Sequence, residues 1–201
     1  MRPLKTEPPK PNFFLFSTFV YLGMGCLGML LVLLGDLDLG LHFWQWSTDR
    51  TLRVFGVGVL GAGIILGLGI FFEMQFPEFK RFRGLLKPYI QDIPPMGILY
   101  LAFLSGFFEE LLFRGALQPF AGILLTSILF GAIHLGPGGL SLWSLWAVFS
   151  GFLMGLEAMA AKSILAPALT HVIVNCVSML RLKYSFKPVS DDSVSAHIRG
   201  S

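Results

Sequence analysis

Long apolar runs without charged residues alternate with short polar segments along the chain. The first run, Phe13 to Leu34, is long enough to cross a bilayer, which takes about 20 residues in a helix. Five further runs follow at about 54–72, 96–117, 120–134, 140–160 and 163–182. This pattern predicts an all-α, polytopic membrane protein in which about six transmembrane helices form a single domain over residues 13–182.

The segments between these runs suggest how the domain is bounded. Residues 1–12 are basic and proline-rich and predict a disordered arm, whereas residues 183–201 predict a polar, mobile tail. Trp44 and Trp46 suit a membrane interface. The stretch from Phe79 to Lys87 mixes basic with apolar residues and favours a short segment along the lipid headgroups, with a solvated loop as the alternative.

Two loop signals concern the fourth run. Pro119 predicts a tight connection between the third and fourth helices, because proline starts a helix far better than it continues one. Gly136 to Gly139 is expected to end the fourth helix.

Composition supports a membrane protein and excludes a nucleic-acid-binding one. Hydrophobic residues make up 54% of the chain and charged residues 13%, against about 25% charged in soluble domains. The net charge of +3 comes from Lys and Arg at the ends of apolar runs, not from a basic face. Cys26 and Cys176 show no CxxC spacing and are interpreted as packing residues.

The distribution of basic residues predicts orientation. Six spans place both termini on one side, and Lys and Arg concentrate there, in residues 1–12, 79–87 and 181–199. The opposite side carries Arg50, Arg53 and Lys162. By the positive-inside rule we expect both termini in the cytoplasm, with the bilayer of a bacterial inner membrane around the helices.

Charged residues are rare inside the apolar region. Between Asp92 and Arg181 they are Glu109, Glu110, Arg114, Glu157 and Lys162. A charge at mid-bilayer costs at least about 2.5 to 3.5 kcal/mol, so such residues need partners or a watery cavity. Glu157 and Lys162 are expected near the outer interface, with a structural role.

Helical phase separates the two adjacent glutamates. Glu110 and Arg114 are four residues apart and predict a self-neutralising, supporting ion pair. Glu109 is rotated by about 100° and remains available for chemistry.

Two other helices contribute polar faces. His134 lies one turn after Phe130, and Asn175 lies one turn after His171. Singly, such residues in membrane helices usually serve packing. Together with Glu109 they form a set suited to hydrolysis, in which Glu109 and His134 activate water while His171 and Asn175 donate to an oxyanion.

A zinc site is the alternative use of the same residues. Glu109, His134 and His171 form a ligand set that leaves a position for water. However, the chain has no H-E-x-x-H motif, and Arg114 would place a cation near the metal. Hydrolysis without a cofactor is therefore preferred over zinc.

Three motifs carry a family resemblance. Glu109-Glu-Leu-Leu-Phe-Arg114, Phe130-Gly-Ala-Ile-His134 and His171-Val-Ile-Val-Asn175 appear in this order, and the resemblance covers about residues 100–180. In them the chain resembles the CPBP intramembrane endopeptidases, which include CAAX prenyl proteases of the Rce type, bacteriocin-processing enzymes and Abi proteins. The resemblance implies that Glu109 and His134 activate water, that His171 and Asn175 form the oxyanion site, and that Glu110 and Arg114 support them.

The depths of the motifs raise a geometric question. At about 1.5 Å per residue, Glu109 and His171 lie about 12 to 13 Å from the outer ends of their predicted helices, but His134 lies about 21 Å from the start of its own. The motifs therefore meet only if the fourth helix tilts or starts further out than Pro119 suggests.

The expected function is an intramembrane endopeptidase acting on a peptide or a membrane-anchored protein. One rival is a proton-coupled carrier that uses Glu109, His134 and His171 as a relay, although the sequence shows no internal repeat. The other is a non-catalytic membrane scaffold. The sequence does not specify an oligomeric state.

Overall fold

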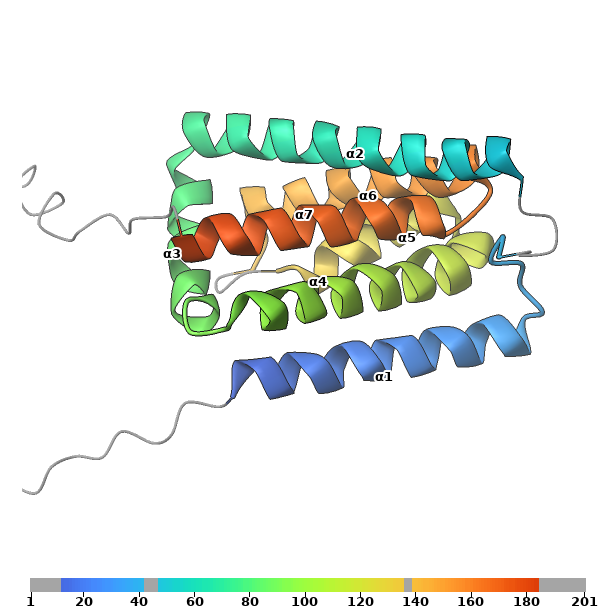
Figure 1. Cartoon of the computed structure of the whole chain (residues 1–201), viewed down its shortest axis with the longest axis horizontal. Helices are drawn as coiled ribbons and strands as arrows, with labels where there is room; N and C mark the ends of the chain where they lie inside the picture. Colours follow the sequence, from blue (N-terminus) through green and yellow to red (C-terminus); the bar gives the residue numbers. More distant parts are fainter. Residues whose placement is uncertain (1–11, 42–46, 136–138, 185–201) are drawn as a thin grey trace, which may run out of the picture.

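The structure, a computed structural model, describes residues 12–41, 47–135 and 139–184, and it folds them into helices (Figure 1). In chain order these are α1 (Phe13–Leu34), α2 (Thr48–Gln75), α3 (Pro77–Ile90), α4 (Pro95–Glu110), the π-helical segment η2 (Leu111–Leu117), α5 (Gln118–Ile133), α6 (Leu142–Ala161) and α7 (Leu165–Tyr184). The all-α prediction is confirmed. Most of the predicted arm and tail, Trp44, Trp46 and residues 136–138 lie outside the described residues.

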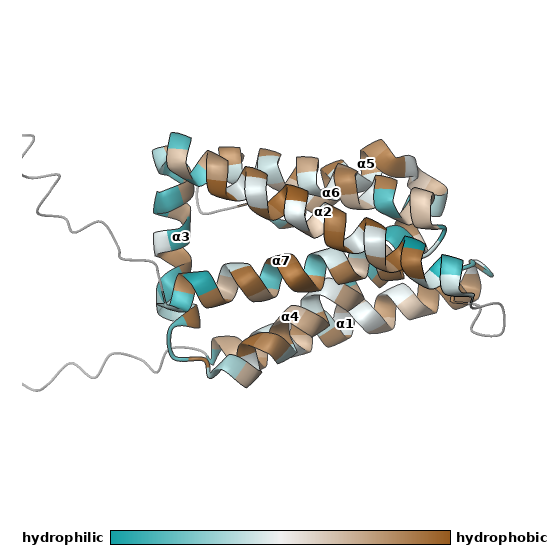
Figure 2. Cartoon of the chain, turned by 45° about the horizontal axis from the view of Figure 1, so that its top comes forward, coloured by the Kyte–Doolittle hydropathy of each residue, from teal (hydrophilic) through white to brown (hydrophobic). Residues whose placement is uncertain are grey.

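Among the described residues, five helical segments are long and apolar enough to cross a membrane. Four are α1, α2, α6 and α7, and the fifth is the stretch Pro95–Ile133, whose 39 residues contain the predicted third and fourth spans. The protein is thus a multi-pass membrane protein, but the count of six is not confirmed. Hydrophobic residues predominate along these helices (Figure 2). Large apolar side chains such as Phe19 on α1 and Leu124 on α5 are exposed, as a lipid-facing surface requires.

Helix ends follow capping signals more closely than hydropathy. The bounds of α1 match the prediction, whereas α2 begins at Thr48 and not at about residue 54. The side chain of Ser47 accepts a hydrogen bond from the backbone N–H of Arg50 at 3.2 Å, and Asp49 lies in the first turn. A capped helix start of this kind extends α2 beyond its apolar core.

Helix α3 lies across one end of the bundle, and it is among the most hydrophilic parts of the described chain (Figures 1 and 2). It buries Phe79 and Ile90 and exposes Lys80 and Arg81. The basic segment is therefore a helix with one apolar face, as the interfacial interpretation requires, and not a loop.

The chain reverses direction at Gly122. This residue has φ 71° and ψ 168°, a backbone region that is essentially limited to glycine. The rings of Phe113 and Phe130 lie 5.2 Å apart, and Glu109 faces His134. In each pair, the two residues lie at nearly equal distances along the chain before and after Gly122. The helical segments on the two sides of Gly122 therefore run antiparallel.

The expected connection at Pro119 is therefore wrong by three residues. Pro119 is the second residue of α5, which follows η2 directly, and the helix continues through it to the reversal at Gly122. Measured from Gly122 at about 1.5 Å per residue, Glu109 lies about 20 Å and His134 about 18 Å along the chain. This similar depth is what lets the motifs meet.

Glycines allow close contacts between the helices that carry the motif residues. A Cβ atom at Gly106 of α4 would lie 2.6 Å from the backbone nitrogen of Val172 in α7. At Gly28 of α1 it would lie 3.0 Å from backbone atoms of Leu112. The backbones of α4 and α7 approach closely at Gly106, next to Glu109 and Glu110.

We predict that Gly106→Ala destabilises the protein by about 1 to 3 kcal/mol, because the neighbouring atom belongs to backbone and cannot rotate away. Gly63→Ala on α2 is the matched control, since no atom lies within 4 Å of its Cβ position. Thermal unfolding of both variants in detergent measures the difference. Equal midpoints for the two variants would contradict the packing argument.

Candidate active site

Glu110 is fully buried and has two partners. Its Oε1 lies 2.9 Å from Nη1 of Arg114 and 2.8 Å from Nδ1 of His171. The predicted ion pair with Arg114 is confirmed, and Glu110 additionally joins α4 to α7. Because a carboxylate oxygen only accepts, Nδ1 of His171 donates in this bond.

Arg114 extends the same network to α6. Its Nη2 donates to the carbonyl oxygen of Gly151 at 2.7 Å, and its guanidinium carbon lies 4.7 Å from the centre of the Phe130 ring. An ion pair, a carbonyl and an aromatic face together offset the cost of burying the cation. The sequence predicts the ion pair but not the contact with α6.

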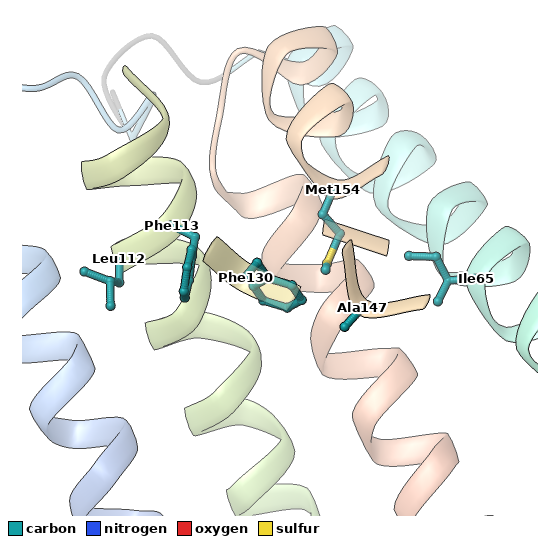
Figure 3. Close-up of a cluster of buried hydrophobic side chains, with 6 residues drawn as sticks. All are labelled: Ile65, Leu112, Phe113, Phe130, Ala147 and Met154. Carbon is teal, nitrogen blue, oxygen red and sulfur yellow. The ribbon is translucent and has the colours of Figure 1, made fainter. Parts of the chain in front are cut away.

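Phe130 connects this network to the apolar core. Figure 3 shows it at the centre of a cluster formed by Ile65, Leu112, Phe113, Phe130, Ala147 and Met154. Its ring also lies 4.6 Å from the ring of His134 and 5.8 Å from that of His171. The aromatic residue of the second motif therefore packs against both imidazoles.

Glu109 and His134 face each other across the hairpin. Oε2 of Glu109 lies 3.9 Å from Nε2 of His134, which is too long for a hydrogen bond. Nδ1 of His134 lies 2.8 Å from the carbonyl oxygen of Phe130 and donates to it. In the neutral ring this leaves the lone pair of Nε2 directed toward Glu109.

Asn175 contacts Ser105, which the sequence motifs do not include. Its Nδ2 donates to Oγ of Ser105 at 2.8 Å, and this hydroxyl donates to the carbonyl oxygen of Ala102. Ser105 lies one turn before Glu109 on the same face of α4. This i, i+4 spacing is the feature of the sequence that could have predicted Ser105 as part of the site. Ser105 thereby fixes the amide of Asn175 beside the face that carries Glu109.

A cavity of about 410 Å³ contains part of this set. Glu109, His134, Ser105 and Asn175 line it, and its walls are mostly apolar. His171, Glu110 and Arg114 do not line it. The structure therefore divides the six predicted site residues into three at the cavity and three behind it.

The cavity extends toward α3, where an ion-pair group lies. Oε2 of Glu73 is 3.3 Å from Nη1 of Arg83 and 3.5 Å from Nη2 of Arg181. These residues line the cavity together with Phe82 and Trp143, whose rings stack at 4.4 Å. Burial lowers the pKa of Arg83 from its ordinary value, while the adjacent Glu73 carboxylate acts in the opposite direction.

The site does not fit the zinc alternative. Over the described ranges, no group of three His, Cys, Asp or Glu side chains converges so that it could hold a metal ion. His171 directs Nδ1 to Glu110, while Glu109 and His134 face each other without a third ligand.

Comparisons with known proteins agree with the motifs. A family model described as type II CAAX prenyl endopeptidase Rce1-like matches residues 91–177, which include all three motifs. The chain is also 28% identical over 181 residues to the uncharacterized protein YpbD of Bacillus subtilis (strain 168), a match that covers 84% of this chain and 93% of that protein. No solved structure matches. In the region that carries the three motifs, the chain is thus similar to the Rce1-like family of type II CAAX prenyl endopeptidases.

Proposed function

We propose that this protein hydrolyses a peptide bond of a membrane-anchored protein or peptide. The observation that carries the proposal is the pair formed by Glu109 and His134, which face each other at 3.9 Å on the wall of a largely apolar cavity. A water molecule placed about 2.8 Å from each group would bond to both. An apolar cavity suits a hydrophobic peptide segment.

Water activation would use both side chains. Glu109 accepts a proton from the water while Nε2 of His134 orients it, and the water oxygen attacks the carbonyl carbon of the scissile bond. Oε2 of Glu109 is buried and has no hydrogen-bond partner among the described residues, so it is available for this role. The proton then passes to the leaving nitrogen as the C–N bond breaks, which balances the reaction.

Stabilisation of the oxyanion is proposed for Asn175, which lines the cavity, and for His171, one turn earlier on α7, although His171 itself does not line the cavity. The Nδ2 group of Asn175 has two hydrogens, and Ser105 takes one of them. Because Nδ1 of His171 donates to Glu110, a second donor at Nε2 requires the imidazolium form, for which Glu110 is the counter-charge. In this proposal Glu110 and Arg114 position His171.

We place the α3 end of the bundle in the cytoplasm of a bacterial cell. Lys80, Arg81 and Arg83 of α3 lie at this end together with Arg181 and Lys183 of α7, as the positive-inside rule expects. The cavity extends toward the same end. Substrates would then be cleaved at a site in or near the cytoplasmic half of the bilayer.

The proposal predicts that Glu109→Gln lowers kcat by about 100- to 10,000-fold, because the amide keeps the shape but cannot accept the proton. Cleavage of a quenched fluorescent membrane peptide by purified protein measures this. Glu78→Gln, the same change at an exposed position of α3, is the control and retains full activity. A folded Glu109→Gln variant as active as wild type would rule out the assignment, and loss of stability alone would favour a scaffold.

A chelator should leave the activity of the wild-type protein unchanged, because no step of the proposed mechanism uses a metal ion. The test compares cleavage before and after dialysis against the chelator. Inactivation that added zinc reverses would establish the metal-dependent alternative.

Asn175→Ala should reduce kcat by about 100- to 1,000-fold and change KM little, since an oxyanion donor acts mainly in the transition state. Cys176→Ala is the neighbouring control on α7, because Cys176 does not line the cavity. A rise in KM at constant kcat would instead assign Asn175 to substrate binding.

A further inference from the structure

Glu157 of α6 is a third buried carboxyl group that the proposed mechanism does not use. The sequence predicts a position near the outer interface, but the side chain does not face solvent there, since the residue is only 7% exposed. Lys162, by contrast, is exposed after the end of α6. Glu157 instead lies between α2 and α7, where its carboxyl group meets Thr170.

The hydroxyl of Thr170 has two acceptor oxygens beside it. Oγ1 lies 2.8 Å from the carbonyl oxygen of Gly58 in α2 and 2.6 Å from Oε2 of Glu157. A hydroxyl has one proton, and a carbonyl oxygen can only accept. If the hydroxyl donates to Gly58, the short contact with Glu157 is a hydrogen bond only when the carboxyl group itself donates.

The other oxygen of Glu157 supports the same conclusion. Oε1 is buried and has no hydrogen-bond partner among the described residues. It packs against Gly61 of α2 so closely that a Cβ atom there would overlap it. An ionised carboxylate would leave charge on an oxygen without a donor, whereas the carbonyl oxygen of a protonated acid tolerates this position at lower cost.

The charged groups around Glu157 do not pair with it. Arg114 of η2 has committed Nη1 to Glu110 and Nη2 to Gly151. His171 of α7 directs Nδ1 to Glu110, and His134 of α5 faces Glu109. Between residues 53 and 73, α2 has no titratable side chain. In the described part of the chain, no ion pair therefore compensates a charge on Glu157.

Thr170 connects this site to the candidate active site. It precedes His171 on α7, so its side chain points about 100° away around the helix. Thr170 bonds to α2 and α6 on one side of α7, and His171 bonds to α4 on the other side. Together these hydrogen bonds fix the rotation of α7 about its axis. We propose that Glu157 is a protonated positioning residue that acts through Thr170 to hold His171 against Glu110.

The first test measures protonation and does not depend on activity. Infrared spectra of the purified wild-type protein at neutral pH should contain a protonated-carboxyl band that is missing from Glu157→Gln. Glu109→Gln serves as a reference, because its spectrum should retain that band. If wild type and Glu157→Gln do not differ in this region, Glu157 is ionised and the inference is wrong. This result stands whether or not the proposed proteolysis is found.

The second test rests on the proposed function and measures positioning. Thr170→Val should lower kcat by about 10- to 100-fold with little change in KM, the usual loss when an outer partner of a site residue is removed. Thr126→Val is the matched control, since Thr126 is equally buried and its hydroxyl has no partner in the described part of the chain. Equal activity of the two variants would overturn the positioning role.

Variants of Glu157 separate positioning from a purely structural role. Glu157→Gln keeps a neutral donor and should retain wild-type activity at neutral pH, whereas Glu157→Leu should resemble Thr170→Val. At alkaline pH the wild-type protein should lose activity as Glu157 becomes charged, while Glu157→Gln retains it. Coincident alkaline profiles of wild type and Glu157→Gln would contradict the proposal.

Discussion

The candidate site depends on the hydrogen bonds and the ion pair of the Glu110 carboxylate. One oxygen of this fully buried group binds Arg114 and His171, and Arg114 in turn binds α6. Four helical units, α4, η2, α6 and α7, are thereby tied to one buried charge. Removing any partner would leave a buried charge uncompensated, which explains why a chain with so few charged residues keeps these together.

The three buried glutamates differ in their surroundings and hence in what they can do. Glu110 is ion-paired with Arg114, which suits a supporting role. Glu109 lies at the cavity with one oxygen free of partners, as a base requires. Glu157 contacts the hydroxyl of Thr170 and has no ion-pair partner in the described part of the chain, which suits a protonated acid. In the proposed mechanism the same side chain thus takes three roles, which depend on the neighbouring donors, the neighbouring cations and access to the cavity.

Helix geometry makes this arrangement possible. The reversal at Gly122 places the first and second motifs at similar depth, and the glycine at position 106 lets α7 approach the first motif. The π-helical turn η2 follows Glu110 directly, as such turns often do at functional sites. Phe130 then fills the space between the two imidazoles.

The sequence by itself determined the helical membrane architecture, the partnership of Glu110 with Arg114 and the residues of the cluster, because hydropathy and helical phase are local properties. It also indicated that Glu109 is separate from that pair. Only the tertiary structure decided that the turn lies at Gly122, that His171 binds Glu110, that Ser105 holds Asn175 and that Glu157 is buried. These depend on the rotation and depth of one helix against another, which the spacing of residues within a helix does not specify.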